Sequence, residues 1–174
     1  MLKNMKSNPW LPYLIVFGIL ILLLVYTQFR EQQYQVVIEP IFKFKPDEVT
    51  GFSISKDNVS VTIVKKDTAW VFAEPDTGQP AKYKIEQFFK DVLKGEREGS
   101  VTDDTSRYAK LGVHETSATK LVIRHEQKDL AIVFAGRSQT DYNQEYLRYA
   151  DDLRVYPSRQ KLVNKLGAVA SWWR

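Results

Sequence analysis

The sequence contains no cysteine, and this absence excludes several kinds of chemistry at once. Without a thiol, the chain forms no disulfide bond, holds no thiolate-bound metal and offers no thiol nucleophile. A lipid-modified N-terminal cysteine is excluded for the same reason. Any catalysis or metal binding would therefore depend on other side chains.

Histidine is nearly as scarce, since His114 and His125 are the only two in 174 residues. Each is followed by glutamate, so two His–Glu pairs are conceivable as zinc ligands. The sequence lacks H-x-x-x-H and H-E-x-x-H spacing, however, and a zinc site needs about three or four ligands held together. We expect His114 in a loop, His125 at a strand end, and no metal site.

Sequence motifs of nucleophilic and phosphate-binding sites are also lacking. No serine lies in a G-x-S-x-G element, and the segment Gly95–Gly99 does not match a phosphate-binding loop. The paired carboxylates Asp103-Asp104 and Asp151-Asp152 are typical of turns, with a calcium contact as the alternative. The sequence therefore predicts no catalytic residue and no cofactor.

The basic residues form no cluster. Of the 25 lysines and arginines, Lys3, Lys6 and Arg30 lie in the first 30 residues, which contain no acidic residue. The remaining 22 are balanced by 21 acidic residues with the signs mixed along the chain. A nucleic-acid-binding protein normally concentrates lysine and arginine on one face or in one block. We expect no nucleic-acid partner.

One long apolar run is present. No residue from Trp10 to Phe29 is charged, and a helix of about 20 such residues matches the roughly 30 Å hydrocarbon core of a bilayer. Trp10 and Tyr13 at one end, and Tyr26 and Phe29 at the other, stand where aromatic side chains meet the membrane interface. The run predicts a transmembrane helix in contact with the lipid bilayer.

The residues after this run are bulky, whereas a signal peptidase requires small ones, so we expect an uncleaved signal anchor. Lysines precede the helix and almost all of the chain follows it, which favours a cytoplasmic N-terminus. The predicted organisation is a cytoplasmic segment 1–9, a signal anchor 10–29, a stalk 30–41 and a domain 42–174. The location is then a bacterial inner (cytoplasmic) membrane, crossed once, with the C-terminal domain in the periplasm or outside the cell.

The domain shows α+β periodicity. Apolar residues alternate with polar ones in the hairpins 52–63, 121–134 and 145–156, and the segment 69–72 predicts a further strand. The residues 83–93 have the spacing of an amphipathic helix, and Ser158 is a suitable N-cap for a second one that ends at Gly167. We therefore predict a single N-terminal transmembrane helix followed by a β-hairpin-rich domain with two amphipathic helices.

Aromatic side chains are concentrated near the end of the chain. Core packing explains many such residues, but tyrosine, tryptophan and arginine are also enriched where proteins bind each other. A strand such as Tyr146–Tyr149 carries bulky groups on both faces, and we expect one face of a single-layer sheet to be exposed. The candidate partner-binding residues are Tyr142, Tyr146, Arg148, Tyr149, Tyr156, Trp172 and Trp173.

Several short elements follow one another in a recognisable order: Val49–Ile54, Val59–Ile63, Ala69–Phe72, Tyr108–Val113, Gly136, Tyr146–Tyr149, Val155-Tyr156 and Trp173-Arg174. After an N-terminal membrane helix, this order resembles the family catalogued as domain of unknown function 4340 (DUF4340). The likeness covers the segment from Phe42 to Arg174. One departure is the lack of a proline after Leu111-Gly112, where Ser117 or Ala118 stands instead.

The resemblance implies a role in a membrane complex, because such proteins are often encoded beside ABC-transporter permease and ATPase genes and a large exported auxiliary subunit, including gliding-motility-type systems. It implies no activity and supplies no catalytic residue. We therefore expect an extracytoplasmic interaction or scaffold module, an accessory subunit of an inner-membrane ABC-transporter-type complex. The expected partners are the transporter permease or the auxiliary subunit, or other membrane or periplasmic proteins.

Two alternatives remain open. A lipid- or glycan-binding module of the cell envelope would have a deep apolar cavity between the sheet and a helix. An envelope hydrolase would have a pocket lined by His114 or His125 with a carboxylate and a serine nearby.

Overall fold

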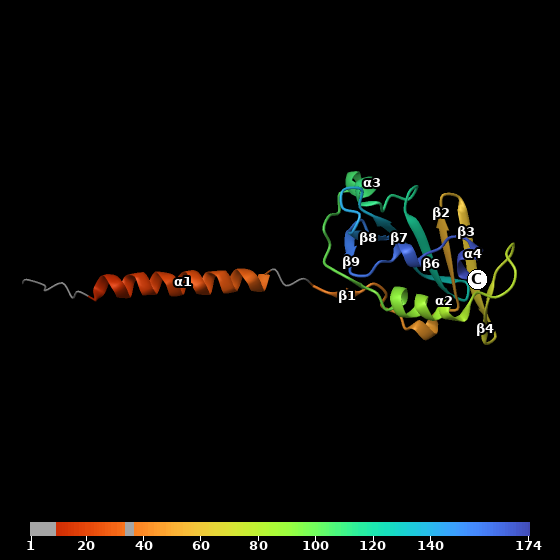
Figure 1. The fold of residues 1–174 in the computed structure, drawn as a ribbon, viewed down its shortest axis with the longest axis horizontal. Helices are drawn as coiled ribbons and strands as arrows, with labels where there is room; N and C mark the ends of the chain where they lie inside the picture. The colour runs from red at the N-terminus through yellow and green to blue at the C-terminus, as the bar shows by residue number, and fades with distance from the viewer. Residues whose placement is uncertain (1–9, 34–36) are drawn as a thin grey trace, which may run out of the picture. The chain divides into compact units, whose positions relative to one another are not determined.

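The structure is a computed structural model, and it describes residues 10–33 and 37–174. The chain divides into two compact units, of which the first contains the helix α1 (Leu11–Gln33) and the second is Val37–Arg174. Figure 1 shows both units along the chain. The predicted cytoplasmic segment 1–9 and part of the predicted stalk, residues 34–36, lie outside the described residues.

The helix α1 coincides with the long apolar run of the sequence. The apolar side chains described along it, from Tyr13 to Tyr26, are exposed on all sides of the helix. A search of the described residues for a helix with the length and hydropathy of a membrane span finds none.

The second unit is built on a large antiparallel sheet with few helices. The described residues form nine strands in the order β1-β5-β9-β8-β7-β6-β2-β3-β4. The strands are β1 (Glu39–Pro40), β2 (Gly51–Lys56), β3 (Val59–Lys66), β4 (Ala69–Phe72), β5 (Glu96–Arg97), β6 (Thr119–His125), β7 (Lys128–Arg137), β8 (Glu145–Tyr149) and β9 (Val155–Ser158). The longest α-helix described in this unit is α2 (Lys82–Gln87), which continues as the π-helical turn η2 (Phe88–Leu93).

The three predicted hairpins are confirmed as β2–β3, β6–β7 and β8–β9, and the predicted strand 69–72 is β4. The turn of β2–β3 contains Asp57 and Asn58 with positive φ, and Glu126 has positive φ in the turn of β6–β7. Two-residue hairpin turns favour this backbone conformation because it matches the twist of the paired strands. Local sequence is thus sufficient to specify these hairpins.

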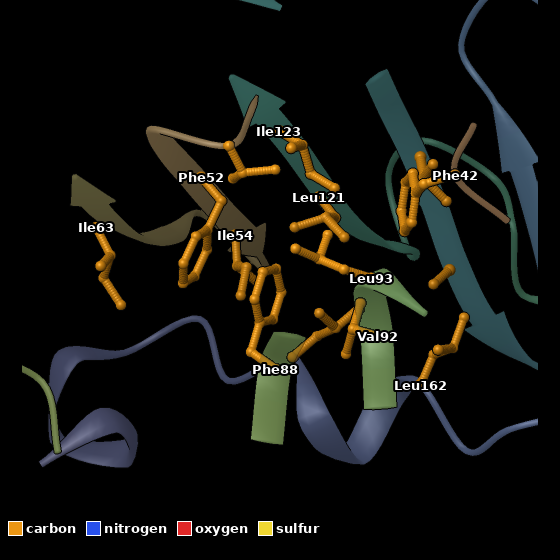
Figure 2. Packing of buried hydrophobic residues seen from close by; sticks show 14 of the residues in the cluster. Phe42, Phe52, Ile54, Ile63, Phe88, Val92, Leu93, Leu121, Ile123 and Leu162 are labelled. Carbon is orange, nitrogen blue, oxygen red and sulfur yellow. The ribbon is translucent and has the colours of Figure 1, made fainter. Parts of the chain in front are cut away.

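The main hydrophobic core lies between one face of the sheet and the α2–η2 helix. Alternate residues of neighbouring strands point to this face, so that Phe52 and Ile54 of β2 lie opposite Ile123 and Leu121 of β6. Figure 2 shows these side chains meeting Phe88, Val92 and Leu93 of η2. The predicted amphipathic helix 83–93 is confirmed.

The second predicted helix is wrong. Ser158 is a buried residue of β9, and its hydroxyl donates to the Gln160 carbonyl at 2.7 Å instead of capping a helix. The chain then forms the 3₁₀ turn η4 (Val163–Lys165) and the short helix α4 (Ala170–Trp173). The buried Glu145 carboxylate accepts from the backbone N–H groups of Leu162 and Val163 at 2.6 and 3.0 Å, and this cap fixes the turn.

The opposite face of the sheet is covered near β8, contrary to the expectation of an exposed face. The 3₁₀ turn η3 (Thr105–Arg107) and the helix α3 (Tyr108–Leu111) pack there with a second apolar cluster formed by Tyr108, Leu111, Val113 and Val155. The Arg148 guanidinium lies 4.6 Å from the ring centroids of both Tyr108 and Phe134. The main core therefore buries one face of β8, and the segment Thr105–Leu111, distant in sequence, covers the other face.

Candidate functional site

A cleft of about 700 Å³ opens at one end of the sheet. The segment Ile41–Phe44 forms one wall, the first half of β7 forms another, and the turn between β8 and β9 forms a third. Arg97, Tyr149 and Tyr156 complete the lining. This volume lies within the range typical of sites for small molecules or peptide side chains.

The wall formed by β7 is an open strand edge. β8 pairs with β7 only from Val133 to Arg137, whereas β6 pairs with β7 along its length back to Lys128. The Ala150 N–H donates to the Ile132 carbonyl at 2.9 Å and extends the contact by one hydrogen bond. Among the described residues, no strand pairs with the Lys128–Ala131 part of β7 on the side of the cleft.

The wall formed by Ile41–Phe44 is held in place from both sides. The Ile41 N–H donates to the Gly95 carbonyl at 2.9 Å, and the Tyr149 hydroxyl donates to the Ile41 carbonyl at 2.5 Å. Phe42 and Phe44 pack against each other with ring centroids 5.3 Å apart. In the described structure, no backbone hydrogen bond joins this wall to β7, so the two walls remain separate.

Arg97 is the most buried charged group of the lining, since its side chain is 11% exposed. Its guanidinium lies 3.8 Å from the centroid of the Tyr156 ring, and its Nη2 donates to the Glu39 carboxylate at 2.5 Å. The Nε atom is buried and has no hydrogen-bond partner among the described residues.

Asp152 organises the third wall. Its carboxylate accepts from the Arg154 backbone N–H at 2.9 Å and from two nitrogens of the Arg154 guanidinium. The Tyr156 hydroxyl also donates to it at 2.7 Å. Hydrogen bonds from Arg154, followed by the one from Tyr156, hold the pKa of Asp152 well below its usual range. Burial and then the Asp152 carboxylate raise the pKa of Tyr156 to about 12.

Replacement of Asp152 by asparagine tests this network. Because the folded-state pKa of Asp152 is lower than its ordinary value of about 3.9, the charged carboxylate stabilises the fold above that pH. The stabilisation is lost as the pH falls further toward the folded-state pKa. We expect Asp152→Asn to lower the free energy of unfolding by about 1 kcal/mol at pH 7, since the Arg154 partner is largely exposed.

Urea unfolding of the two proteins between pH 3 and 8 is the measurement. The difference should be constant from pH 5 to 8 and should shrink below about pH 4. Asp151→Asn serves as the control, because Asp151 is exposed and makes no ion pair within the described residues. An Asp152→Asn difference that grows on acidification would contradict the assignment.

The structure does not bring the seven candidate partner-binding residues together. Tyr149 and Tyr156 line the cleft, while Tyr146 and Arg148 lie on the opposite face of the sheet. Tyr142 is 74% exposed in the loop between β7 and β8. Trp172 is half-buried against Lys84, and Trp173 belongs to the core. The buried side chains of Arg148, Tyr156 and Trp173 offer little surface to a partner.

The histidines and paired carboxylates lie where loops and turns were predicted. His114 follows α3 and contacts the Thr116 hydroxyl at 3.0 Å, whereas His125 ends β6 beside the Glu48 carbonyl. Neither lines the cleft. Asp104 caps η3 by accepting from the Ser106 N–H at 2.9 Å. Within residues 10–33 and 37–174, no group of three or more metal-ligating side chains is present.

Among the predicted membrane-interface residues, Trp10, Tyr13 and Tyr26 are exposed. The side chain of Phe29 lies outside the described residues.

Sequence reasoning missed most of the cleft. Arg97 stands in a polar stretch with no motif around it, and no pattern pairs the segment Ile41–Phe44 with the distant strand β7. A weak signal existed in the spacing of Asp152, Arg154 and Tyr156, since alternate residues near a strand share one face.

Comparison of the chain with protein families, with curated proteins and with solved structures finds no match. The resemblance to DUF4340 therefore stays a prediction.

Proposed function

We propose that the protein is a membrane-anchored extracytoplasmic interaction module, an accessory subunit of an inner-membrane transporter-type complex. In this role α1 holds the chain in the bilayer, and the sheet domain binds another membrane or periplasmic protein. The observation that carries the proposal is the apolar helix α1, whose described side chains from Tyr13 to Tyr26 are exposed on all sides.

The physical support is the cost of exposing such a helix to water. The uncharged part of α1, Leu11–Phe29, spans about 28 Å at 1.5 Å per residue, which is close to the roughly 30 Å of a hydrocarbon core. The run Trp10–Phe29 has no charge and leaves no polar face for solvent. Lipid contact would remove the apolar surface of this run from water, which is the favourable term in the proposal.

The transporter partner follows from the resemblance to DUF4340 given above. A binding role fits the domain, because neither histidine lines the cleft and no cluster of metal ligands exists among the described residues. The lipid- or glycan-binding alternative called for an apolar cavity between the sheet and a helix. The cleft instead lies between the segment Ile41–Phe44 and residues of the four strands β5, β7, β8 and β9, and charged groups line it.

The proposal is tested on native membranes of the source cell. We expect the full-length chain to stay with the membrane after alkaline carbonate washing, and to co-purify from mild detergent with a transporter permease or an exported auxiliary subunit. Mass spectrometry identifies the co-purified proteins. A double substitution within α1, Leu20→Arg with Leu23→Arg, should release the chain from the washed membrane, since each central arginine costs about 3 kcal/mol of insertion.

The matched control is the pair Lys56→Arg with Lys128→Arg, which adds no charge and changes exposed residues at the end of β2 and the start of β7. Release of the unaltered protein by carbonate would refute the anchor. Stable membrane retention without any co-purifying transporter or auxiliary protein would refute the role as an accessory subunit.

A further inference from the structure

The outer face of the α2–η2 helix is basic. Its exposed side chains are those of Lys82, Tyr83, Glu86, Gln87, Lys90 and Lys94. Glu86 lies 3.8 Å from Lys82, and Asp91 pairs with Lys165 of η4 at 2.9 Å. Lys90 and Lys94 make no ion pair within the described residues. The η2 end of the helix therefore presents two free positive charges in a domain whose charges are otherwise balanced.

This basic end lies beside the entry of the chain into the domain. The Ile41 N–H donates to the carbonyl of Gly95, the residue that follows Lys94, at 2.9 Å. Figure 1 shows β1 next to the end of the green helix where η2 finishes. Val37 and Ile38, which precede β1, are 59% and 48% exposed. Two aliphatic side chains and two free lysines thus gather at this end of the domain.

The length of the chain keeps this end close to a bilayer that holds α1. Only residues 34–36 separate α1 from the second unit. Phe29 is followed by four more residues of α1, so about 20 Å of chain at most leads from the uncharged run to Val37. A short tether of this kind gives an effective concentration in the millimolar range, at which even a weak contact with the membrane is populated.

The chemistry of this end matches anionic phospholipid. Lysine side chains lay their methylene groups along apolar surface and place the ammonium group near lipid phosphates. Tyr83, which is 56% exposed on the same helix, is a residue type favoured at membrane interfaces. The nearby acids Glu39 and Glu96 are each paired with an arginine, and Glu98 is half-buried. The free charge that is most exposed at this end is therefore positive.

We propose that the η2 end of the α2–η2 helix, together with Val37 and Ile38, lies on the anionic surface of the bilayer that α1 spans. Lys90 and Lys94 contact lipid phosphate groups, and the two aliphatic side chains enter the interfacial layer. This inference rests on the proposed function and names the face of the domain that lipid covers.

The test uses the full-length chain in lipid nanodiscs with an environment-sensitive dye on a single cysteine, since the chain has no cysteine of its own. Gln87→Cys places the dye on the exposed face of the helix, three residues before Lys90. Val59→Cys is the control, because Val59 is 47% exposed beside the β2–β3 turn, which Figure 1 shows at the other end of the sheet from α2. With phosphatidylglycerol in the nanodisc, brominated lipid should quench the dye at position 87 and leave the dye at position 59 bright.

Charge variants test the role of the lysines. Lys90→Glu with Lys94→Glu should lower the ratio of docked to undocked domain at least about fivefold for each lysine, and the quenching at position 87 should fall accordingly. The matched control is Lys56→Glu with Lys128→Glu, which reverses two exposed lysines at the ends of hairpin strands and should change nothing. Raising the salt concentration should undock the unaltered chain, because salt screens exposed charges.

Four results overturn the inference. They are equal quenching at positions 87 and 59, quenching that persists in phosphatidylcholine alone, quenching that survives both high salt and the two glutamates, and burial of position 87 in native membranes but not in nanodiscs. The last result would mean that a protein covers this face.

The two proposals fail differently. Release of the unaltered chain from membranes by carbonate refutes the anchor, on which both depend. Retention of the chain with no quenching at position 87 refutes only the docking of the helix. Co-purification of a transporter or auxiliary protein tests the accessory role and does not depend on where the helix lies.

Discussion

Replacement of Trp173 by alanine should lower the free energy of unfolding by about 4 kcal/mol, the largest single loss that we expect in this domain. The Trp173 side chain is fully buried, and its ring lies 5.3 Å from that of Phe52 and 5.9 Å from that of Phe88. Its Nε1–H donates to the Gly167 carbonyl at 2.8 Å. Alanine would leave a cavity between the sheet and η2 and would remove the donor that pairs with the partly buried Gly167 carbonyl.

Urea unfolding followed by circular dichroism measures the loss, with Trp172→Ala as the neighbouring control. Trp172 is only half-buried and contacts Lys84 at 3.7 Å from its ring centroid, so its replacement should cost clearly less than that of Trp173. Equal costs for the two tryptophans would contradict the placement of Trp173 in the core. If Trp173→Ala is too unstable to purify, Trp173→Phe supplies a smaller and measurable loss.

Replacement of Gly136 by alanine should cost about 3 kcal/mol or more, because no space exists for a methyl group. A Cβ atom at Gly136 would overlap the backbone of Gly112, which crosses directly over β7. Gly112 itself ends α3 with φ of 75°, a left-handed conformation that favours glycine. The obstacle is backbone on both sides, so a rotamer change cannot relieve it.

Gly99→Ala is the control for this experiment. A Cβ atom at Gly99 meets nothing within 4 Å, and its φ lies outside the left-handed region, so we expect no loss of stability. Thermal unfolding of both variants compares them directly. A Gly136→Ala protein as stable as Gly99→Ala would show that α3 does not cross β7 in this way.

The parts of the fold that were predicted correctly are those set by local sequence. The hairpin β2–β3 follows from alternation around a turn with Asp57 and Asn58, and the α2–η2 helix follows from apolar residues at helical spacing. Both signals lie within about a dozen residues, so neither needs knowledge of distant contacts.

The errors arose where tertiary contacts override local signals. Ser158 has the chemistry of a helix cap, but its pairing opposite Glu145 places it in a strand. Arg148 was read as a surface residue, whereas α3 covers it from a segment some 40 positions away and leaves it 5% exposed. No pattern in β8 itself reports what will pack on its second face.

The candidate site was missed for a related reason. The cleft depends on a difference in length between β7 and β8, which becomes meaningful only after their register is known. Arg97 belongs to β5, a strand of two residues that pairs with β1. Such a short strand cannot be recognised from the alternation of apolar and polar residues. What sequence does offer is the acid, base and tyrosine at alternate positions 152, 154 and 156.

The burial of Trp173 against Phe52 has a consequence for biosynthesis. The two residues are separated by most of the domain, so the ribosome releases the first strands long before it adds the side chain that seals them. Until then Phe52 and Phe88 lack the contact with Trp173, and the nascent polypeptide remains loosely packed and open to proteases or chaperones. A chain that is truncated before Trp173 would lack this contact and would not complete its core.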